Sequence, residues 1–403
     1  MRRILSFCLL VCLPLAAQVA PIPTSTELPG SPFAIKKNWI IGGAGSWDYL
    51  TIDPVAKRLY IAHGHSVQVV DLDSGAVAGE IAGFREAHAI ALDDTGQYGY
   101  VSDGPANAIA IFDRRALRVE ATIAIGCAPR SIAFERQSKL VFAICGANAA
   151  VPVPSSPQRR SSLTSHVVVI DTDSKTVLAD MVVAGDFRFA QATDNGQVYV
   201  TVDPASQSSP SQIAKLDGPA IAAEAHRRRD ADSPKSPSSD AVIFDWSGTN
   251  PPISLVRFLV PAGCRNPQSF AVDHKDRRLF ASCNDQQFVV LDSGTGDLIA
   301  KMTTGPGDDV IGYDPDHELI YSANGGGYGS LTIIQQDANT DSYAVVQNLP
   351  TLARASTLAV DPSTGYVYLV TDYTGVDLTP SGGFGAIKTA PIAGSFRVLV
   401  VGH

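Results

Sequence analysis

An acidic residue followed by an aromatic residue seven positions later recurs along this chain, and internal repetition of this kind constrains a fold more than any other sequence feature. Six pairs keep the spacing: Asp53 and Tyr60, Asp93 and Tyr100, Glu135 and Phe142, Asp273 and Phe280, Asp314 and Tyr321, and Asp361 and Tyr368. A seventh pair, Asp194 and Tyr199, is five residues apart. We call the first member of each pair the acidic anchor. The chain contains seven copies of one unit.

The residues before each anchor alternate between large and small. Leu92 follows Ala91 in the second unit, and Tyr313 follows Gly312 in the sixth. Alternation with a period of two indicates a β-strand, and a strand with one small face is typical of the innermost strand of a propeller blade. Further apolar runs complete each unit at a repeat of about 40 residues. We predict an all-β fold, a seven-bladed β-propeller of four-stranded antiparallel blades.

The last unit supplies only three strands before the chain ends. The missing outer strand is predicted at the other terminus, in the run Trp39 to Gly43. An N-terminal strand that completes the last blade would close the ring and leave only short, protected strand edges. We therefore assign residues 37–403 to a single propeller domain, with insertions at 147–164, 204–254 and 373–394.

Two kinds of segment carry a family resemblance. Tyr199-Val200-Thr201-Val202 is close to a Tyr-Val-Thr-Asn repeat signature, and the segments ending at Ala133 and Ala271 have the form Pro-x-x-φ-Ala, where φ is apolar. The chain resembles the YVTN/YncE-like propellers, a periplasmic or secreted family, over residues 37–403. The resemblance implies the fold and transfers no catalytic residue.

The N-terminus has the pattern of a secretory signal peptide. Arg2 and Arg3 precede an apolar run from Ile4 to Leu15, and small residues follow at Ala16, Ala17 and Ala20. The run is too short to span a bilayer. We predict a signal peptide at 1–20, a linker at 21–36, no membrane span and a periplasmic or secreted location. A lipid anchor at Cys12 is the weaker alternative, because Val11 is a poor residue before such a cysteine.

The charge balance bears on possible partners. The chain carries 31 Lys and Arg against 40 Asp and Glu, a formal net charge of −9. It has no lysine- or arginine-rich tail, so nucleic acid is not expected as a partner.

Four cysteines remain after the signal peptide, in one arrangement used twice. Cys127 and Cys264 each precede an innermost strand, and Cys145 and Cys283 each end the strand that follows. Four cysteines allow three connectivities, and the repeat favours Cys127–Cys145 and Cys264–Cys283. A metal site is the alternative. The spacing is not Cys-x-x-Cys and no histidine neighbours these cysteines in sequence, so we predict disulfides, with no metal or cofactor.

Basic residues gather just before or at the start of innermost strands. The candidate ligand-binding residues are Arg130, Arg188, Arg265, Arg354, His88 and Asp309, with Arg85, Asp48 and Asp308 near them. Converging guanidinium groups suit a carboxylate or phosphate. The alternative is that each arginine pairs with a neighbouring carboxylate or loop carbonyl. The first and last long insertions, and the start of the middle one, emerge on this same channel-mouth face, where loops commonly carry function. They could equally be surface loops without a partner.

The expected function is a non-catalytic binding or scaffolding role for a monomer. Its channel-mouth face would bind a partner protein or a small anionic ligand. The alternative is a propeller enzyme, either a lactonase-like hydrolase or a cofactor-dependent dehydrogenase, which rests on fold analogy. The sequence has no Gly-x-Ser-x-Gly, His-Glu-x-x-His or Cys-x-x-Cys-His motif that would name a catalytic group.

Overall fold

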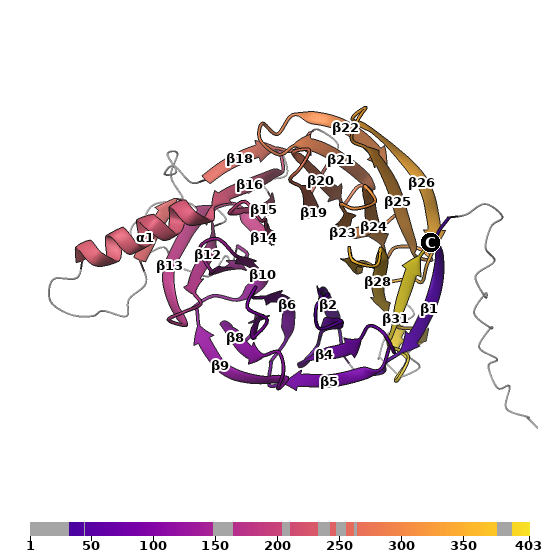
Figure 1. The fold of residues 1–403 in the computed structure, drawn as a ribbon, viewed down its shortest axis with the longest axis horizontal. Helices are drawn as coiled ribbons and strands as arrows, with labels where there is room; N and C mark the ends of the chain where they lie inside the picture. Colours follow the sequence, from indigo (N-terminus) through magenta and orange to yellow (C-terminus); the bar gives the residue numbers. More distant parts are fainter. Residues whose placement is uncertain are drawn as a thin grey trace, which may run out of the picture.

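Seven sheets, each built on four antiparallel strands, surround a central axis in the computed structural model (Figure 1). The structure describes residues 32–43, 45–147, 164–203, 210–232, 242–246, 255–261, 264–376 and 389–403. Four-stranded blades follow one another around the ring in chain order, so the predicted seven-bladed β-propeller is confirmed. The predicted signal peptide, 1–20, lies outside the described residues, as do most of the first and last predicted insertions and part of the middle one.

In blades 1 to 6 the four strands follow one another outward from the axis in sequence order. Blade 1 contains β2 (Trp47–Asp53), β3 (Arg58–His63), β4 (Ser66–Asp71) and β5 (Val77–Ala82). Blade 2 contains β6 (Ala87–Leu92), β7 (Tyr98–Asp103), β8 (Ala108–Asp113) and β9 (Arg118–Ala124). Blade 3 contains β10 (Pro129–Glu135), β11 (Leu140–Cys145), β12 (Thr164–Asp171) and β13 (Thr176–Ala184). Blade 4 contains β14 (Asp186–Ala192), β15 (Gln197–Asp203), β16 (Gln212–Asp217) and β18 (Leu255–Leu259).

Blades 5 and 6 follow the same order, whereas blade 7 has the N-terminal strand outermost. Blade 5 contains β19 (Pro267–Asp273), β20 (Arg278–Cys283), β21 (Gln287–Asp292) and β22 (Leu298–Thr303). Blade 6 contains β23 (Asp308–Asp314), β24 (Leu319–Asn324), β25 (Ser330–Asp337) and β26 (Ser342–Pro350). Blade 7 contains β27 (Thr357–Asp361), β28 (Tyr366–Thr371), β31 (Arg397–Gly402) and the N-terminal β1 (Ala34–Ile40). A short hairpin, β29 (Thr374–Val376) and β30 (Thr389–Pro391), lies between β28 and β31 in sequence.

The ring closes through β1, as predicted, but the closing strand begins earlier than expected. It pairs antiparallel with β31 from Ala34 to Ile40, so part of the predicted linker is strand and Ile41 to Gly43 follow it. Phe33 explains the earlier start, because it is buried against blade 6 and exchanges hydrogen bonds of 3.1 and 3.0 Å with Gln347. Exposed Lys36 and Lys37 interrupt the apolar pattern, and charges of this kind protect an edge strand from further pairing.

The repeated aromatic residue fills the space between neighbouring blades. All six aromatics at the seven-residue spacing are almost fully buried: Tyr60, Tyr100, Phe142, Phe280, Tyr321 and Tyr368. The small face of the innermost strand has the complementary role. A Cβ placed on Gly312 would lie 2.4 Å from Val360 Cγ2 of the next blade. The large–small alternation thus reflects close packing between adjacent innermost strands.

In six of the seven blades, the acidic anchor accepts a backbone hydrogen bond at the end of the innermost strand opposite the channel mouth. The Asp53 carboxylate accepts a hydrogen bond of 3.0 Å from the amide of Ala56, three residues beyond the strand end. Equivalent bonds from turn amides are accepted by Glu135, Asp273, Asp314 and Asp361, and Asp93 accepts one from the amide of Tyr98 at the start of β7. The repeated carboxylate is therefore a structural feature, which satisfies turn amides that the strands leave unpaired.

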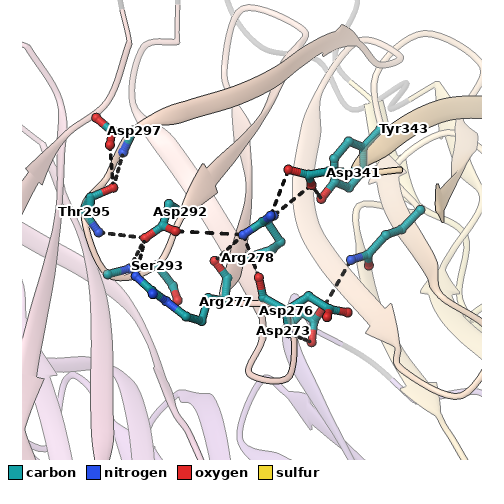
Figure 2. Close-up of polar contacts among 12 residues, drawn as sticks. Asp273, Asp276, Arg277, Arg278, Asp292, Ser293, Thr295, Asp297, Asp341 and Tyr343 are labelled. Carbon is teal, nitrogen blue, oxygen red and sulfur yellow. Dashed lines mark hydrogen bonds and ion pairs between the residues drawn. The ribbon is translucent and has the colours of Figure 1, made fainter. Parts of the chain in front are cut away.

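Arginines on this anchor face join neighbouring blades. Arg114 of blade 2 pairs with Asp53 of blade 1 and Asp93 of its own blade. Figure 2 shows the junction of blades 5 and 6, where Arg278 lies 2.8 Å from Asp341 and also approaches Asp292. These ion pairs link blade 1 to blade 2 and blade 5 to blade 6.

The middle insertion contributes two elements outside the four-stranded pattern. Helix α1 (Gly218–Asp232) lies on the outside of the ring beside β13 (Figure 1). Strand β17 (Val242–Trp246) pairs parallel with β13 and makes blade 3 a five-stranded sheet. The fifth strand was not predicted, because its pairing joins segments far apart in the chain and leaves no local pattern.

Candidate functional site

One polar residue from each blade surrounds the mouth of the central channel. These seven residues, which we call the mouth ring, are Asp48, His88, Arg130, Arg188, Gln268, Asp309 and Ser356. Each lies five residues before the anchor of its blade, except Arg188, which precedes Asp194 by six. The repeat therefore places equivalent side chains around one opening.

Two adjoining cavities occupy this opening. The first has a volume of about 480 Å³ and is lined by Asp48, His88, Arg130, Arg188 and Gln268 of the mouth ring. The second, of about 450 Å³, is lined by Gln268, Asp309 and Ser356, together with Trp47 and Arg354. Gln268 lines both, so the two cavities meet at blade 5.

Aromatic side chains cross the channel below the mouth ring. The ring of Tyr49 in blade 1 lies 5.3 Å from that of Phe189 in blade 4, which lies 5.2 Å from that of Phe270 in blade 5. Tyr49 lines the first mouth cavity and also a channel cavity of about 690 Å³ between the innermost strands. This aromatic row gives the polar mouth an apolar floor.

The charges of the mouth ring are segregated. His88, Arg130 and Arg188 come from the consecutive blades 2, 3 and 4, whereas Asp309, Ser356 and Asp48 come from blades 6, 7 and 1. A basic arc thus faces an acidic and neutral arc across the channel. Such an arrangement favours a ligand with an anionic end and a hydrogen-bond-donating end.

His88 and Asp48 connect the two arcs. His88 Nδ1 lies 2.9 Å from Asp48 Oδ2, and this hydrogen bond raises the pKa of His88. Burial raises the pKa of Asp48, although its contact with His88 acts in the opposite direction. Burial, reinforced by the negative charge of Asp48, raises the pKa of Asp309 to about 6. The acidic arc can therefore carry a proton in mildly acidic solution.

The predicted arginines differ in their surroundings. Arg188 lies 2.8 Å from Asp203 and 3.2 Å from Asp186, and Arg354 lies 2.6 Å from Asp372 and stacks on Trp47. Among the described residues, no carboxylate lies within ion-pair distance of Arg130. It is exposed and projects into the first mouth cavity.

Arg265 and Arg85 lie outside both mouth cavities. Arg265 is exposed, and it stands three residues before Gln268, the ring member of its blade. The Pro129-Arg130 and Pro267-Gln268 steps are equivalent in sequence, so Gln268 and not Arg265 corresponds to Arg130. Arg85 Nη1 donates to the carbonyl of Pro105, the loop-carbonyl contact that was the alternative expectation. The side chain of Asp308 is outside the described part of the structure.

Gln268, Ser356 and Asp48 complete the ring but were not chosen as site residues from sequence. The spacing from the anchor could have identified these residues, because the mouth-ring residue stands five positions before the anchor in six blades. The carboxylates that neutralise arginines were also missed. Asp203 and Asp372 lie at or just after the end of the second strand of their blades. In blades 3 and 5, the equivalent position is occupied by Cys145 and Cys283.

Both predicted disulfides are present. Cys127 is bonded to Cys145 with a Cα–Cα distance of 5.9 Å, and Cys264 to Cys283 with 5.1 Å. Each joins the segment before an innermost strand to the end of the second strand on the channel-mouth face. No group of three or more His, Cys, Asp or Glu in the described ranges is arranged to hold a metal ion. No described helix is long and apolar enough to cross a membrane.

Comparison with known proteins supports the architecture. The structure of U3-55K superposes with a TM-score of 0.61 at 11% identity, covering 89% of this chain and 97% of that one. The WD40 repeats of RRP9 give 0.60 at 10% identity, covering 90% and 96%. Hydrazine synthase of Kuenenia stuttgartiensis gives 0.60 at 14% identity, covering 82% and 94%. This likeness shows the fold alone. No family model and no curated protein matches the sequence.

Proposed function

We propose that this protein is an exported binding propeller whose mouth ring takes a small carboxylate with hydroxyl groups at its other end, such as a sugar acid. The guanidinium of Arg130, which pairs with no carboxylate of the described residues, carries the proposal. It is exposed in a cavity of about 480 Å³, beside Arg188 and a histidine that Asp48 helps to keep protonated. A guanidinium without a protein partner can bind a ligand carboxylate through two parallel hydrogen bonds.

The acidic arc supports the second half of the ligand assignment. Asp309 lies across the mouth ring from Arg130, Asp48 lines the same cavity as Arg130, and both carboxylates accept hydrogen bonds, from which a simple inorganic anion would gain nothing. Ligand hydroxyl groups would donate to these carboxylates. Tyr49 below offers an aromatic surface for the face of a sugar ring.

Export is proposed on the N-terminal sequence pattern. The basic start, the short apolar run and the small residues up to Ala20 are typical of a signal peptide. Two disulfides are compatible with an oxidising periplasmic or extracellular compartment. The Tyr-Val-Thr and Pro-x-x-φ-Ala segments support membership of the YVTN/YncE-like propellers, and we expect a monomer.

A thermal-shift comparison tests the ligand class. Phosphate, citrate and glucuronate would be titrated against the mature protein, Arg130→Ala and Arg265→Ala. Arg265 is an exposed arginine from an equivalent segment outside the cavities and is the matched control. We expect glucuronate to stabilise the mature protein and Arg265→Ala, by about 2.7 kcal/mol at a hundredfold excess over Kd. Arg130→Ala should lose this effect.

Two outcomes would contradict the proposal. No stabilisation of the mature protein by any of the three anions would exclude a small carboxylate as the ligand. Equal loss in Arg130→Ala and Arg265→Ala would place the binding outside the mouth ring. Phosphate alone stabilising the protein would reduce the site to a general anion site and remove the role of the acidic arc.

A further inference from the structure

The disulfide of blade 3 lines a fourth cavity. This cavity, of about 320 Å³, is lined by both Cys127 and Cys145, with Arg130 and His166 among the other residues. Cys127 is half-buried and Cys145 is 2% exposed. Cys127 is thus the more exposed residue of the pair.

His166 is brought opposite Cys145 by strand pairing. The two residues are direct partners in the register of β11 and β12, and side chains so placed lie on one face at close distance. His166 Nδ1 lies 2.9 and 3.0 Å from the two carboxylate oxygens of Asp180 on β13. This contact raises the pKa of His166. Disulfide, imidazole and carboxylate thus form a row across blade 3.

Blade 5 has the same disulfide without these surroundings. Cys264 and Cys283 are buried at 4% and 0% exposure among apolar residues that include Phe270 and Val289. The residue opposite Cys283 on β21 is Gln287. Neither cysteine lines any of the four cavities described above. The disulfide of blade 5 is therefore an internal control for the reactivity of the disulfide of blade 3.

We propose that Cys127–Cys145 is a thiol–disulfide exchange site for a small thiol that carries a carboxylate. Arg130 would hold the carboxylate of the incoming thiol in the cavity. The thiolate attacks Cys127 Sγ, a new disulfide forms between the two, and the Cys127–Cys145 bond breaks. Its electron pair leaves on Cys145 Sγ as a thiolate, which an imidazolium at His166 stabilises. A second thiol of the same class releases Cys127 and completes reduction. This activity does not require a ligand in the mouth ring.

The unsubstituted protein gives the first test. The mature chain would be incubated with reduced glutathione, and samples would be alkylated over time and mapped by peptide mass spectrometry. We expect glutathione on Cys127 and alkylation on Cys145 at a rate at least about tenfold above that of either Cys264 or Cys283. Equal rates for the two disulfides, or reaction of both only after unfolding, would overturn the proposal.

Paired single-cysteine variants test the role of His166. Cys127→Ser frees Cys145 opposite His166, and Cys264→Ser frees Cys283 opposite Gln287. We expect the pH midpoint for alkylation of Cys145 to lie about one unit below that of Cys283, which is a tenfold difference in thiolate fraction. Adding His166→Gln should abolish the difference while Cys283 keeps its midpoint. An unchanged Cys145 midpoint in that double variant would exclude His166 from the exchange reaction. The comparison in the unsubstituted protein holds even if a variant folds poorly.

Discussion

The Asp203 carboxylate lies 2.8 Å from Arg188 Nε in blade 4, at the place where Cys145 is bonded to Cys127 in blade 3. Both contacts tie the end of a second strand to the entry of the innermost strand. In blade 2, Asp103 makes the same connection by accepting the amides of Arg85 and Glu86 at 2.8 and 3.1 Å. A disulfide, an ion pair and a pair of hydrogen bonds thus perform one structural task on the channel-mouth face.

Removing Arg188 should destabilise the protein, because the buried carboxylate of Asp203 would lose its counter-charge. Burial already raises the pKa of Asp203, and one of its oxygens has no hydrogen-bond partner among the described residues. We expect Arg188→Ala to lower the free energy of unfolding by about 1–3 kcal/mol at pH 7. The loss should be smaller at pH 5, because a protonated Asp203 needs no counter-charge. Urea unfolding at the two pH values measures both. Arg188→Ala with Asp203→Asn is the control and should show no pH dependence of the loss.

Gly312 should not tolerate a larger side chain. Its backbone is extended, but a Cβ would meet Val360 Cγ2 at 2.4 Å and Leu358 Cδ1 at 2.6 Å. Overpacking of this kind costs about 1–3 kcal/mol, so Gly312→Ala should unfold at lower urea concentration. Adding Val360→Ala should recover part of the loss. Gly375→Ala is the matched control, because its nearest atom would be an ordinary 3.5 Å away. Equal stability of Gly312→Ala and the parent would contradict the packing argument.

The N-terminal strand should stabilise the whole ring. A chain that begins at Gly42 lacks β1, leaves the edge of β31 unpaired and loses the buried Phe33. We expect its single cooperative melting transition to fall by several degrees, with a tendency to aggregate through the open edge. A chain that begins at Pro32 retains β1 and is the reference. Melting within about a degree of that reference would show that ring closure does not depend on β1.

Asp309 should produce a measurable pH dependence of stability. Its pKa of about 6 in the folded protein exceeds the value near 3.9 of an unfolded chain. Between these values the folded state binds more protons at this group, so its contribution to stability falls as pH rises from about 4 to about 6. Asp309→Asn removes this slope. Relative to the parent, the variant should gain on the order of 1–3 kcal/mol between pH 4 and pH 7, as measured by urea unfolding. A stability difference that stays constant with pH would contradict the assigned burial.

Much of the candidate site could be predicted from the spacing of residues in the sequence. Five of the seven mouth-ring residues were noticed from their position before innermost strands: Asp48, His88, Arg130, Arg188 and Asp309. Arg265 and Arg354 were grouped with them because both precede an innermost strand. The structure separates them, since a shift of two or three residues along the entering segment turns a side chain away from the ring or toward another partner.

Local pattern determined the blade count, the strand order and both disulfides, because alternation, turn residues and repeated cysteine positions act over a few residues within each unit. The tertiary structure decided what no local pattern encodes. The pairing of Arg188 with Asp203, the position of His166 opposite Cys145 and the addition of β17 to the edge of blade 3 all depend on it. Each of these depends on pairing between strands that are separated in the chain. The register of such pairs is set by the packing of the whole ring, so side chains distant in sequence become neighbours only when it closes.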